Sequence, residues 1–333
     1  MSALVVGASG YAGRHALRAF AGSRGVDADG DIEAAAEGAE VVVFCAPTWD
    51  PERKPLERRQ PHPLLARTLA AAREAGARRF VHLSTTAVFG PDHHARIPES
   101  ATPRARHAYE RLKLREEEWL RLNRGQLELV VVRAAAGFGA EDPILGRLLR
   151  QLETGGLRLV NGGRAHHGFL AGPDLGRALA AAAARGRAGS TYVAAGFEGT
   201  WRELLAMASE LMGVPARIGS IPYDIAYLLA AARWLRARPG EPCWPNLYGL
   251  DLLAKDHVYD DAHSRRDLSW SPQVGSFDEG VVDLVRWYRT VYPRPSVGPS
   301  PGVFSPLAGE VPPAVPEGEG SAVSAPATSQ PGK

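Results

Sequence analysis

A glycine-rich loop near the start of the chain constrains the fold more than any other feature. The apolar run Leu4-Val5-Val6 leads directly into GASGYAG at 7–13, and an amphipathic stretch extends over 11–22. Glycines at the GxxGxxG spacing allow a tight turn from a strand into a helix, and the helix N-terminus offers free N–H groups to a phosphate. This order predicts a strand, loop and helix that hold the pyrophosphate of a dinucleotide. The alternative is a glycine-rich turn with no ligand.

The first half of the chain alternates short apolar runs with amphipathic stretches. Such runs between helices are typical of a parallel sheet that is covered by helices on both faces. The sequence therefore predicts an α/β fold with a doubly wound parallel sheet over residues 1–173. The predicted strands are 4–6, 41–44, 80–84 and 127–133, and the predicted helices are 11–22, 63–76, 104–122 and 143–153.

The segment after the first predicted helix is too short for the second strand, helix and third strand of a standard dinucleotide-binding domain. Only residues 23–30 are available before the next predicted helix begins near Asp31. An extended segment of this length spans about 25 Å at ~3.3 Å per residue. It can run along the length of the helix over 11–22 only once. We therefore expect one short strand beside the first, where two are usual, followed by a helix over 31–38.

The acidic residue that binds the adenosine ribose in such folds follows the glycine motif by about 20 residues. This spacing points to Asp31, with Asp27 and Asp29 as alternatives. Asp31 has an equally good interpretation as the N-cap of the helix that follows it. The choice between NAD and NADP therefore stays open at this level.

The second half of the chain is mostly helical. The predicted helices are 174–185, 200–212, 222–237, 246–255 and 276–290, with short extended pieces at 191–195 and 216–220. We expect a smaller, mostly helical substrate lobe over 174–292, with the stretch 164–195 partly returning to the large sheet. Residues 293–333 contain 10 of the 26 prolines, and this composition is typical of a disordered tail.

A tyrosine and a lysine in the predicted helix 104–122 form the candidate catalytic pair. Tyr109 and Lys113 stand four residues apart, so their side chains share one helix face. An ammonium beside a phenol lowers the phenol pKa from ~10, which suits a general acid/base. Lys113 is the only lysine between residues 55 and 254, in a chain with 39 basic residues. A lysine is therefore rarely placed here by chance, although the pair taken alone is compatible with an ordinary solvated helix face.

At these residues the chain resembles the extended branch of the short-chain dehydrogenase/reductase superfamily, which includes epimerases, dehydratases and 3β-hydroxysteroid-dehydrogenase-like enzymes. The resemblance spans about 1–290 and is carried by GASGYAG at 7–13, LSTTAVFGP at 83–91 and Tyr109-x-x-x-Lys113. It implies a Rossmann-type NAD(P)-binding domain with NAD or NADP as cofactor and a small-molecule substrate. It also implies a homodimer as one candidate assembly, with the helix at 105–122 paired against its twin.

The resemblance implies a role for each matching residue. Tyr109 would exchange a proton with a substrate hydroxyl or carbonyl group, Lys113 would hold the nicotinamide ribose, and Thr85 would orient the substrate oxygen. Thr85 is preferred to its two hydroxyl-bearing neighbours because it stands five residues before Gly90, the spacing of the branch. The cofactor-binding residues implied in the same way are Gly7, Ser9, Gly10, Tyr11, Ala12, Gly13, Asp31, Ala46 and Lys113.

The implied activity is that of an NAD(P)-dependent oxidoreductase that interconverts a secondary alcohol and a ketone by hydride transfer. A nucleotide-sugar epimerase of the same branch is the alternative enzyme. The shortened adenosine side motivates a third hypothesis, a catalytically silent cofactor-binding or scaffold relative. Pro47 removes a backbone N–H group near the cofactor, so the cofactor geometry is expected to differ from that of the branch. The apolar helix predicted over 222–237 is too short to span a bilayer and is predicted to be a buried or interface helix. It favours a lipid-like, steroid-like or polyketide-like substrate.

Composition excludes several other classes of protein. A net charge of +2 without a basic block gives no electrostatic footprint for nucleic acid. The N-terminus lacks the pattern of a signal peptide, and no apolar stretch reaches the ~20 residues that span a bilayer. Two cysteines, Cys45 and Cys243, supply neither a disulfide framework nor a CxxC metal pair, which fits a reducing cytoplasm. We expect no metal site, because the histidine pairs at 93–94 and 166–167 lack the i, i+4 spacing.

Overall fold

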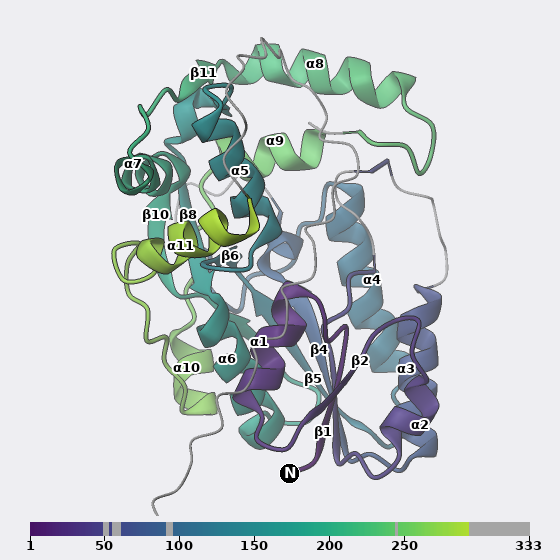
Figure 1. Ribbon diagram of the computed structural model, residues 1–333. Coiled ribbons are helices and arrows are strands. Elements are labelled where there is room, and N and C mark those ends of the chain that lie inside the picture. The colour runs from purple at the N-terminus through teal and green to yellow at the C-terminus, as the bar shows by residue number, and fades with distance from the viewer. Residues whose placement is uncertain (49–52, 55–60, 91–95, 244–245, 293–333) are drawn as a thin grey trace, which may run out of the picture.

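A parallel sheet forms the centre of the computed structural model, which describes residues 1–48, 53–54, 61–90, 96–243 and 246–292. Its strands are β1 (Ala3–Val6), β2 (Arg24–Val26), β3 (Val41–Phe44), β4 (Arg79–Thr85), β5 (Glu128–Ala134) and β9 (Thr191–Ala194). Within the described chain these six strands pair in the order β2-β1-β3-β4-β5-β9, and every pairing is parallel. Helices cover both faces of the sheet (Figure 1). The predicted α/β fold with a doubly wound sheet is confirmed.

Alternate residues of the central strands face opposite layers of helices. Val5 and Val43 pack in the core beneath one layer, and Val6 and Phe44 pack in the core beneath the other. Because successive side chains of a strand point to opposite faces, one continuous apolar run fills both cores. The first layer contains α1 (Tyr11–Ala19) and α6 (Gly172–Arg185), and the second contains α2 (Ile32–Ala36), α3 (Pro63–Glu74) and α4 (Ala108–Asn123).

The shortened region between β1 and β3 contains a single strand, as expected. β2 pairs with β1 from Leu4 with Arg24 to Val6 with Val26 and forms the edge of the sheet. The helix expected over 31–38 is α2, which begins at Ile32 and ends at Ala36. The chain therefore returns to the sheet at β3 after one short crossover.

The helix that carries the candidate catalytic pair begins later than predicted. α4 starts at Ala108, although the pattern predicted a start at residue 104. The Glu110 carboxylate accepts hydrogen bonds from the backbone N–H groups of Arg106 and His107 at 2.6 and 2.9 Å. Because a carboxylate in the first turn satisfies these free donors, it fixes the helix start at this point.

The stretch 164–195 divides between two sheets. β9 joins β5 in the large sheet, as predicted, and α6 packs beside α1. β8 (His166–Ala171) instead pairs with β10 (Phe197–Thr200) and β6 (Ala136–Phe138) in a separate small sheet. Because β4 and β9 already occupy both sides of β5, the large sheet has no place for β8 next to it.

The small sheet and the helices around it share a separate aromatic core. Phe138, Phe169 and Phe277 pack with edge-to-face ring contacts, together with apolar residues of the surrounding helices. The remaining elements are α5 (Pro143–Glu153), β7 (Arg158–Val160), α7 (Trp201–Met212), β11 (Gly219–Ile221), α8 (Tyr223–Arg236), α9 (Leu247–Ala254), α10 (Ala262–Leu268), α11 (Val281–Val291) and the short 3-10 turns η1 (Thr86–Phe89) and η2 (Asn161–Gly163). The sequence analysis missed α10, whose AHSRRDL segment lacks an apolar stripe. The prediction for the tail concerns residues 293–333, which lie outside the described residues.

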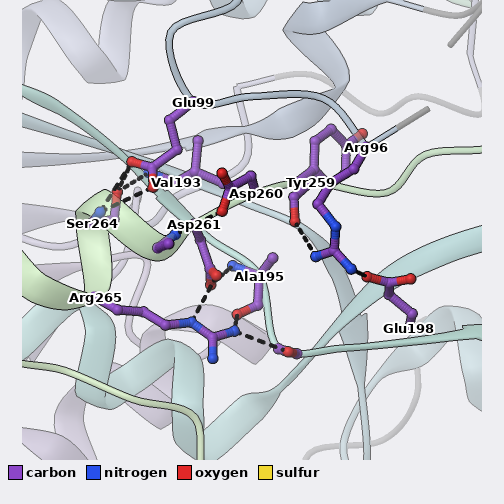
Figure 2. A network of polar contacts seen from close by, with 12 residues as sticks. Arg96, Glu99, Val193, Ala195, Glu198, Tyr259, Asp260, Asp261, Ser264 and Arg265 are labelled. Atoms are coloured by element: carbon purple, nitrogen blue, oxygen red, sulfur yellow. Dashed lines mark hydrogen bonds and ion pairs between the residues drawn. The ribbon is translucent and has the colours of Figure 1, made fainter.

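A network of polar contacts fastens α10 to the end of β9 (Figure 2). The Glu99 carboxylate accepts hydrogen bonds from the backbone N–H and the hydroxyl group of Ser264, at 3.0 and 2.5 Å. The Ser264 hydroxyl accepts a hydrogen bond from the Val193 N–H at 2.8 Å, and Asp261 accepts one from the Ala195 N–H at 3.1 Å. These contacts hold α10 against the edge of the large sheet. Along the described chain, no helix combines the length and apolar character needed to cross a bilayer.

Candidate active site

The carboxyl ends of β1, β3 and β4 bring three predicted segments to one edge of the sheet. The glycine loop follows β1, Ala46 follows β3, and Thr85 ends β4. This is the edge at which ligands bind in open α/β sheets. A Cβ atom on Gly7 would lie 2.5 Å from the Cα of Ala46, and the φ of Gly7 is +85°. The close approach of the two loops therefore requires glycine at this position.

The other two motif glycines shape the turn into α1. A Cβ atom on Gly13 would lie 1.9 Å from the carbonyl oxygen of Gly7, and one on Gly10 would lie 3.3 Å from the same oxygen. Gly10 is the N-cap residue of α1, and no side chain of the described residues caps this helix. The first-turn N–H groups of Tyr11, Ala12 and Gly13 are therefore available to an anion.

The Tyr11 side chain is engaged away from the glycine loop. Its hydroxyl group donates a hydrogen bond to the carbonyl oxygen of Phe138 at 2.9 Å, and its ring packs edge-on against His15. The predicted role of Tyr11 at the dinucleotide site therefore stays a prediction, and it concerns the backbone N–H group rather than the side chain.

Asp27 lies closer to the glycine loop than Asp31. Asp27 directly follows β2, and its Oδ1 accepts a hydrogen bond from the exposed Ser9 N–H at 3.1 Å. Asp31 caps α2, because its Oδ1 accepts a hydrogen bond from the Ala34 N–H at 3.0 Å. Asp31 is therefore the N-cap residue of α2, and Asp27 is the acidic residue that contacts the glycine loop.

The structure brings Thr85 and Tyr109 together. Their partly buried side chains share a hydrogen bond, although 24 residues separate them in the chain. The hydroxyl groups on either side of Thr85 have other partners: Ser84 donates to Oε1 of Glu117 at 2.6 Å, and Thr86 donates to a backbone carbonyl group at 3.3 Å. Among these three hydroxyl groups, that of Thr85 meets the phenol.

Lys113 forms a buried ion pair. Its Nζ lies 2.9 Å from Oε2 of Glu116, and the two residues are 6% and 1% exposed. Although burial alone would lower the pKa of Lys113, the Glu116 carboxylate raises it above its usual value, so the ammonium stays charged. The same Glu116 oxygen lies 3.9 Å from Nε2 of His82, a fully buried ring whose nitrogens have no hydrogen-bond partner among the described residues. Burial holds the pKa of His82 well below its usual value, so this ring is neutral.

The pKa of Tyr109 departs from the expectation drawn from its spacing to Lys113. Burial raises this pKa above its ordinary value, Lys113 lowers it, the Glu116 carboxylate raises it, and the hydrogen bond with Thr85 lowers it. The net shift is upward. The expected depression of the phenol pKa is therefore wrong for the protein without ligands, because burial outweighs Lys113, whose charge Glu116 partly neutralises.

A second buried ion pair supports the end of β4. Glu117 is fully buried and accepts hydrogen bonds from Nε and Nη2 of Arg133 at 3.0 and 2.8 Å, in addition to the one from Ser84. Although burial alone would raise the pKa of Glu117, these hydrogen bonds hold it below its usual value. The pair joins α4 to β4 and β5 directly behind the segment that contains Thr85.

Residues of α8 and α9 lie on the other side of Tyr109. The Tyr248 ring lies 5.0 Å from the Tyr109 ring. Asp251 lies 2.9 Å from Nε2 of His107 and accepts a hydrogen bond from the Tyr223 hydroxyl group at 2.6 Å. Although burial alone would raise the pKa of Asp251, the hydrogen bonds with His107 and Tyr223 hold it below its usual value. α8 and α9 are thereby tied to the N-terminus of α4 and place an aromatic ring beside the phenol.

The sequence analysis did not find Glu116, Tyr248 or Asp251. Glu116 had a local signal, because it follows Lys113 by three residues and so shares its helix face. Asp251 had none, since 144 residues separate it from its partner His107. Such contacts arise only when the two lobes fold against each other.

Cys45 is not activated as a nucleophile. Burial raises the pKa of its thiol to about 12, with Lys113 lowering it only in part. Across the described segments, no group of three or more histidine, cysteine, aspartate or glutamate side chains is arranged to hold a metal ion.

Part of the chain matches the model of a known protein family. Residues 62–195 match the NAD dependent epimerase/dehydratase family. The match includes Thr85, Tyr109 and Lys113, and it begins after the shortened region that contains β2 and α2.

Two curated proteins are similar in sequence. The chain is 28% identical over 215 residues, 62% of its length, to the 4-hydroxy-2-methyl-3-oxo-4-farnesyl-3,4-dihydroquinoline-1-oxide ketoreductase of Stigmatella aurantiaca. It is 28% identical over 221 residues, 64% of its length, to an uncharacterized protein of Sinorhizobium fredii. The matches span 64% and 54% of the lengths of these two relatives.

Solved structures share the fold across most of the chain. The UDP-glucuronic acid 4-epimerase of Bacillus cereus, in complex with UDP-4-deoxy-4-fluoro-glucuronic acid and NAD, is similar with a TM-score of 0.68 and 18% identity, covering 88% of this chain and 100% of that one. The RMD protein of Pseudomonas aeruginosa, complexed with NADPH, gives a TM-score of 0.64 and 18% identity, covering 87% and 99%. The match of residues 62–195 agrees with the family resemblance drawn from the sequence, and the solved structures confirm the predicted fold.

Proposed function

We propose that this chain, whose residues 62–195 match the NAD dependent epimerase/dehydratase family, is an NAD(P)-dependent oxidoreductase that interconverts a ketone and a secondary alcohol. The hydrogen bond between Thr85 and Tyr109 carries the proposal, because it joins an acid/base group to a second donor at the carboxyl edge of the sheet. The buried Lys113 ammonium is close enough to Tyr109 to affect its pKa. Thr85, Tyr109 and Lys113 are the proposed catalytic residues.

The glycine loop fits a dinucleotide. The tight packing of Gly7 against Ala46 and the uncapped N-terminus of α1 leave backbone donors where a pyrophosphate would bind. In the proposal Asp27 replaces Asp31 as the acid for the adenosine ribose, and Lys113 holds the nicotinamide ribose. A bound nicotinamide supplies or accepts the hydride. The remaining proposed cofactor-binding residues are Ser9, Gly10, Tyr11, Ala12 and Gly13, with Tyr11 acting through its backbone.

The side chains at the site account for the proton transfer. Tyr109 donates its phenolic proton to the carbonyl oxygen of the ketone, and Thr85 donates a hydrogen bond to the same oxygen. The charge of Lys113 stabilises the tyrosinate that remains. Because the pKa of Tyr109 is raised, the phenol stays protonated at neutral pH, which is the form that ketone reduction requires. We therefore propose reduction as the direction for which the site is tuned.

The similar proteins support a ketone substrate and define the alternative. The Stigmatella aurantiaca relative is named as a ketoreductase, and its name describes a farnesylated dihydroquinoline oxide. The aromatic neighbour of Tyr109, Tyr248, offers an apolar surface to an aromatic or apolar ketone. The Bacillus cereus structure, which contains a sugar nucleotide and NAD, keeps a nucleotide-sugar epimerase as the alternative.

Titration with the cofactor tests the proposal first. Calorimetric titration with NADH and NADPH in parallel is expected to give a micromolar Kd for one of them, and the complex is then expected to oxidise it with a member of a panel of aromatic and prenylated ketones. Failure of both dinucleotides to bind up to millimolar concentration would identify a silent relative of the family. Cofactor binding with epimerisation of a UDP-sugar and no ketone turnover would favour the epimerase.

Asp27→Asn is expected to weaken NADH binding about tenfold, or ~1.4 kcal/mol, and to affect NADPH less. The carboxylate beside Ser9 would accept hydrogen bonds from a free ribose hydroxyl group but would repel a 2′-phosphate. The matched control is Asp31→Asn, which is expected to bind both dinucleotides normally because asparagine also caps a helix well. Calorimetric Kd values for the two variants decide the assignment, and a larger loss of NADH affinity in Asp31→Asn would return the role to Asp31.

Glu116→Gln is expected to shift the alkaline limb of the pH profile of kcat/KM for ketone reduction to lower pH. The Glu116 carboxylate raises the pKa of Tyr109, and the Lys113 ammonium lowers it. Removing the carboxylate leaves the ammonium unneutralised, so Tyr109 loses its proton at lower pH, and reduction, which needs the protonated form, declines earlier. Glu118→Gln, an exposed change on the same helix, is the control and is expected to leave the profile unchanged. An upward shift of the limb in Glu116→Gln would contradict the assignment.

A further inference from the structure

We propose that α8 docks this protein on an anionic lipid surface through four exposed apolar side chains, Ile225, Leu228, Leu229 and Leu235. These residues are called the α8 face below. The proposal concerns a surface that the candidate active site does not use, and it stands whether or not the proposed oxidoreductase activity is correct.

The α8 face presents its apolar side to the surroundings rather than to the core. Its four residues follow each other at i, i+3, i+4 and i+10, so they lie on one side of the helix. They are 53%, 69%, 55% and 82% exposed. The opposite side of α8 packs against the lobe through the small residues Ala226 and Ala230, together with Leu250 of α9. A surface helix of a globular protein normally has the reverse arrangement, with the large apolar residues inward.

The α8 face is the one place where large exposed apolar side chains gather in the described chain. Elsewhere among these residues they occur singly, on separate elements, at Met1, Leu122, Ile144, Leu211 and Val282. Single exposed apolar residues are ordinary, whereas a contiguous patch marks an interaction surface. Figure 1 shows α8 lying across the end of the molecule opposite the N-terminus, with its outer side free of other helices and strands.

Charge favours a negatively charged occupant of this surface. Arg233, Arg236 and Arg238 lie in and just after the last turns of α8, and Lys54 is held there by hydrogen bonds to the carbonyl oxygens of Trp234 and Ala237, both at 2.9 Å. The acidic residues between 223 and 241 are Asp224 in the first turn and Glu241 after the helix. The end of α8 therefore has four positively charged side chains, whereas the same segment has two carboxylates. This combination is typical of helices that lie in the interface of an anionic membrane.

The size of the α8 face favours a lipid surface over a second copy of the chain. α8 has 14 residues. At ~1.5 Å per residue and about 10 Å of width, its outer side covers roughly 200 Å². A standard protein–protein interface covers about 800 Å² on each partner. Insertion of one amphipathic helix needs no larger footprint and gives weak, reversible attachment.

α8 is linked to the candidate active site through α9. Tyr223, at the start of α8, donates a hydrogen bond to Asp251 of α9, and α9 also carries Tyr248, whose ring meets that of Tyr109. Docking through α8 would therefore hold the site against the lipid surface. If the proposed ketone reduction is correct, this arrangement suits a ketone that is dissolved in the membrane; that extension, unlike the docking itself, rests on the proposed function.

Co-sedimentation of the full chain with vesicles tests the docking. The protein is expected to sediment with vesicles of phosphatidylcholine and phosphatidylglycerol at 7:3, more weakly with phosphatidylcholine alone, and less as the salt concentration rises. Changing Leu228 and Leu229 together to glutamate is expected to weaken binding to the anionic vesicles at least tenfold. Leu122→Glu alters an 80% exposed leucine on α4 and is expected to bind as the wild type does. Circular dichroism melting of each variant establishes that it is folded.

Three outcomes would overturn the proposal. The first is no sedimentation of the wild type with anionic vesicles, and the second is equal binding by the folded double variant. The third is a wild-type dimer, detected by light scattering, that the double variant converts to a monomer while no vesicle binding is seen; it would assign the α8 face to a second copy. None of these readouts depends on turnover, so a loss of vesicle binding is distinguishable from a failure of the proposed oxidoreductase activity.

Discussion

Tyr109→Phe is expected to reduce kcat for ketone reduction by about 10²–10⁴-fold, the usual contribution of a general acid. The change removes the hydroxyl group that meets Thr85 and leaves the ring in place against Tyr248. Folding and dinucleotide binding are therefore expected to persist. The measurement is the initial rate of NADH or NADPH oxidation with the most active ketone of the panel, together with the calorimetric Kd of the cofactor.

Tyr248→Phe is the matched control for this experiment. It removes a hydroxyl group from the neighbouring ring, which lies 5.0 Å from that of Tyr109, and it is expected to retain turnover within a few-fold of the wild type. Retention of full turnover by Tyr109→Phe would remove the proposed acid from the mechanism. Equal losses in both variants would show that the effect is not specific to the Tyr109 hydroxyl group, which would contradict its assignment as the proton donor.

Glu117→Ala is expected to destabilise the fold by about 3–5 kcal/mol, because it leaves the buried Arg133 guanidinium without its carboxylate partner. Glu117 is fully buried, and it accepts two hydrogen bonds from Arg133 and one from Ser84. The measurement is the free energy of unfolding from a denaturant titration at pH 7. Glu118→Ala, the next residue along α4, is exposed and is expected to change stability by less than about 0.5 kcal/mol.

The loss of unfolding free energy caused by Glu117→Ala is expected to be smaller at acidic pH than at neutral pH. The pKa of Glu117 in the folded protein lies below its ordinary value, so the stability that its ionised form contributes is present above the unfolded-state pKa of ~4.3. That stability is lost as the pH falls through the folded-state pKa. The difference between the wild type and the variant is therefore expected to narrow in acid. A difference that grows as the pH falls would show that Glu117 is not held as a carboxylate.

Local patterns predicted the features of the fold that depend on neighbouring residues. The apolar runs at 41–44 and 127–133 became buried strands, and GASGYAG at 7–13 became the turn between β1 and α1. The length of residues 23–30 was enough to predict a single strand at the sheet edge, because a chain of that length can cross the sheet only once. Helix starts were less accurate, since α4 is positioned by a capping carboxylate rather than by its apolar pattern.

Only those features of the candidate site that depend on the spacing of residues in the sequence could be predicted. The position of Tyr109 relative to Lys113 follows from the helix, and the family resemblance implied that Thr85 belongs to the same site, where its hydroxyl group meets the phenol. The pKa of the Tyr109 phenol could not be predicted from spacing, because it depends on burial and on the Glu116 carboxylate as well as on Lys113. The end of β2 at Val26 places Asp27 beside the glycine loop, and Asp31 lies in the N-cap of α2. The choice between these two aspartates therefore also needed the tertiary structure.

The sequence by itself determined the strands β1, β3, β4 and β5 with the helices between them, the glycine turn and the shared face of Tyr109 and Lys113, since each rests on contacts between residues close together in the chain. Only the tertiary structure decided which carboxylates neutralise which cations, which lobe residues surround the phenol, and that α8 turns its leucines outward. The helix 222–237 was predicted as a buried or interface helix that favours a lipid-like substrate, yet its small residues face the core and its large ones do not. Burial is set by what packs against a helix, and an apolar segment carries no local signal for that choice.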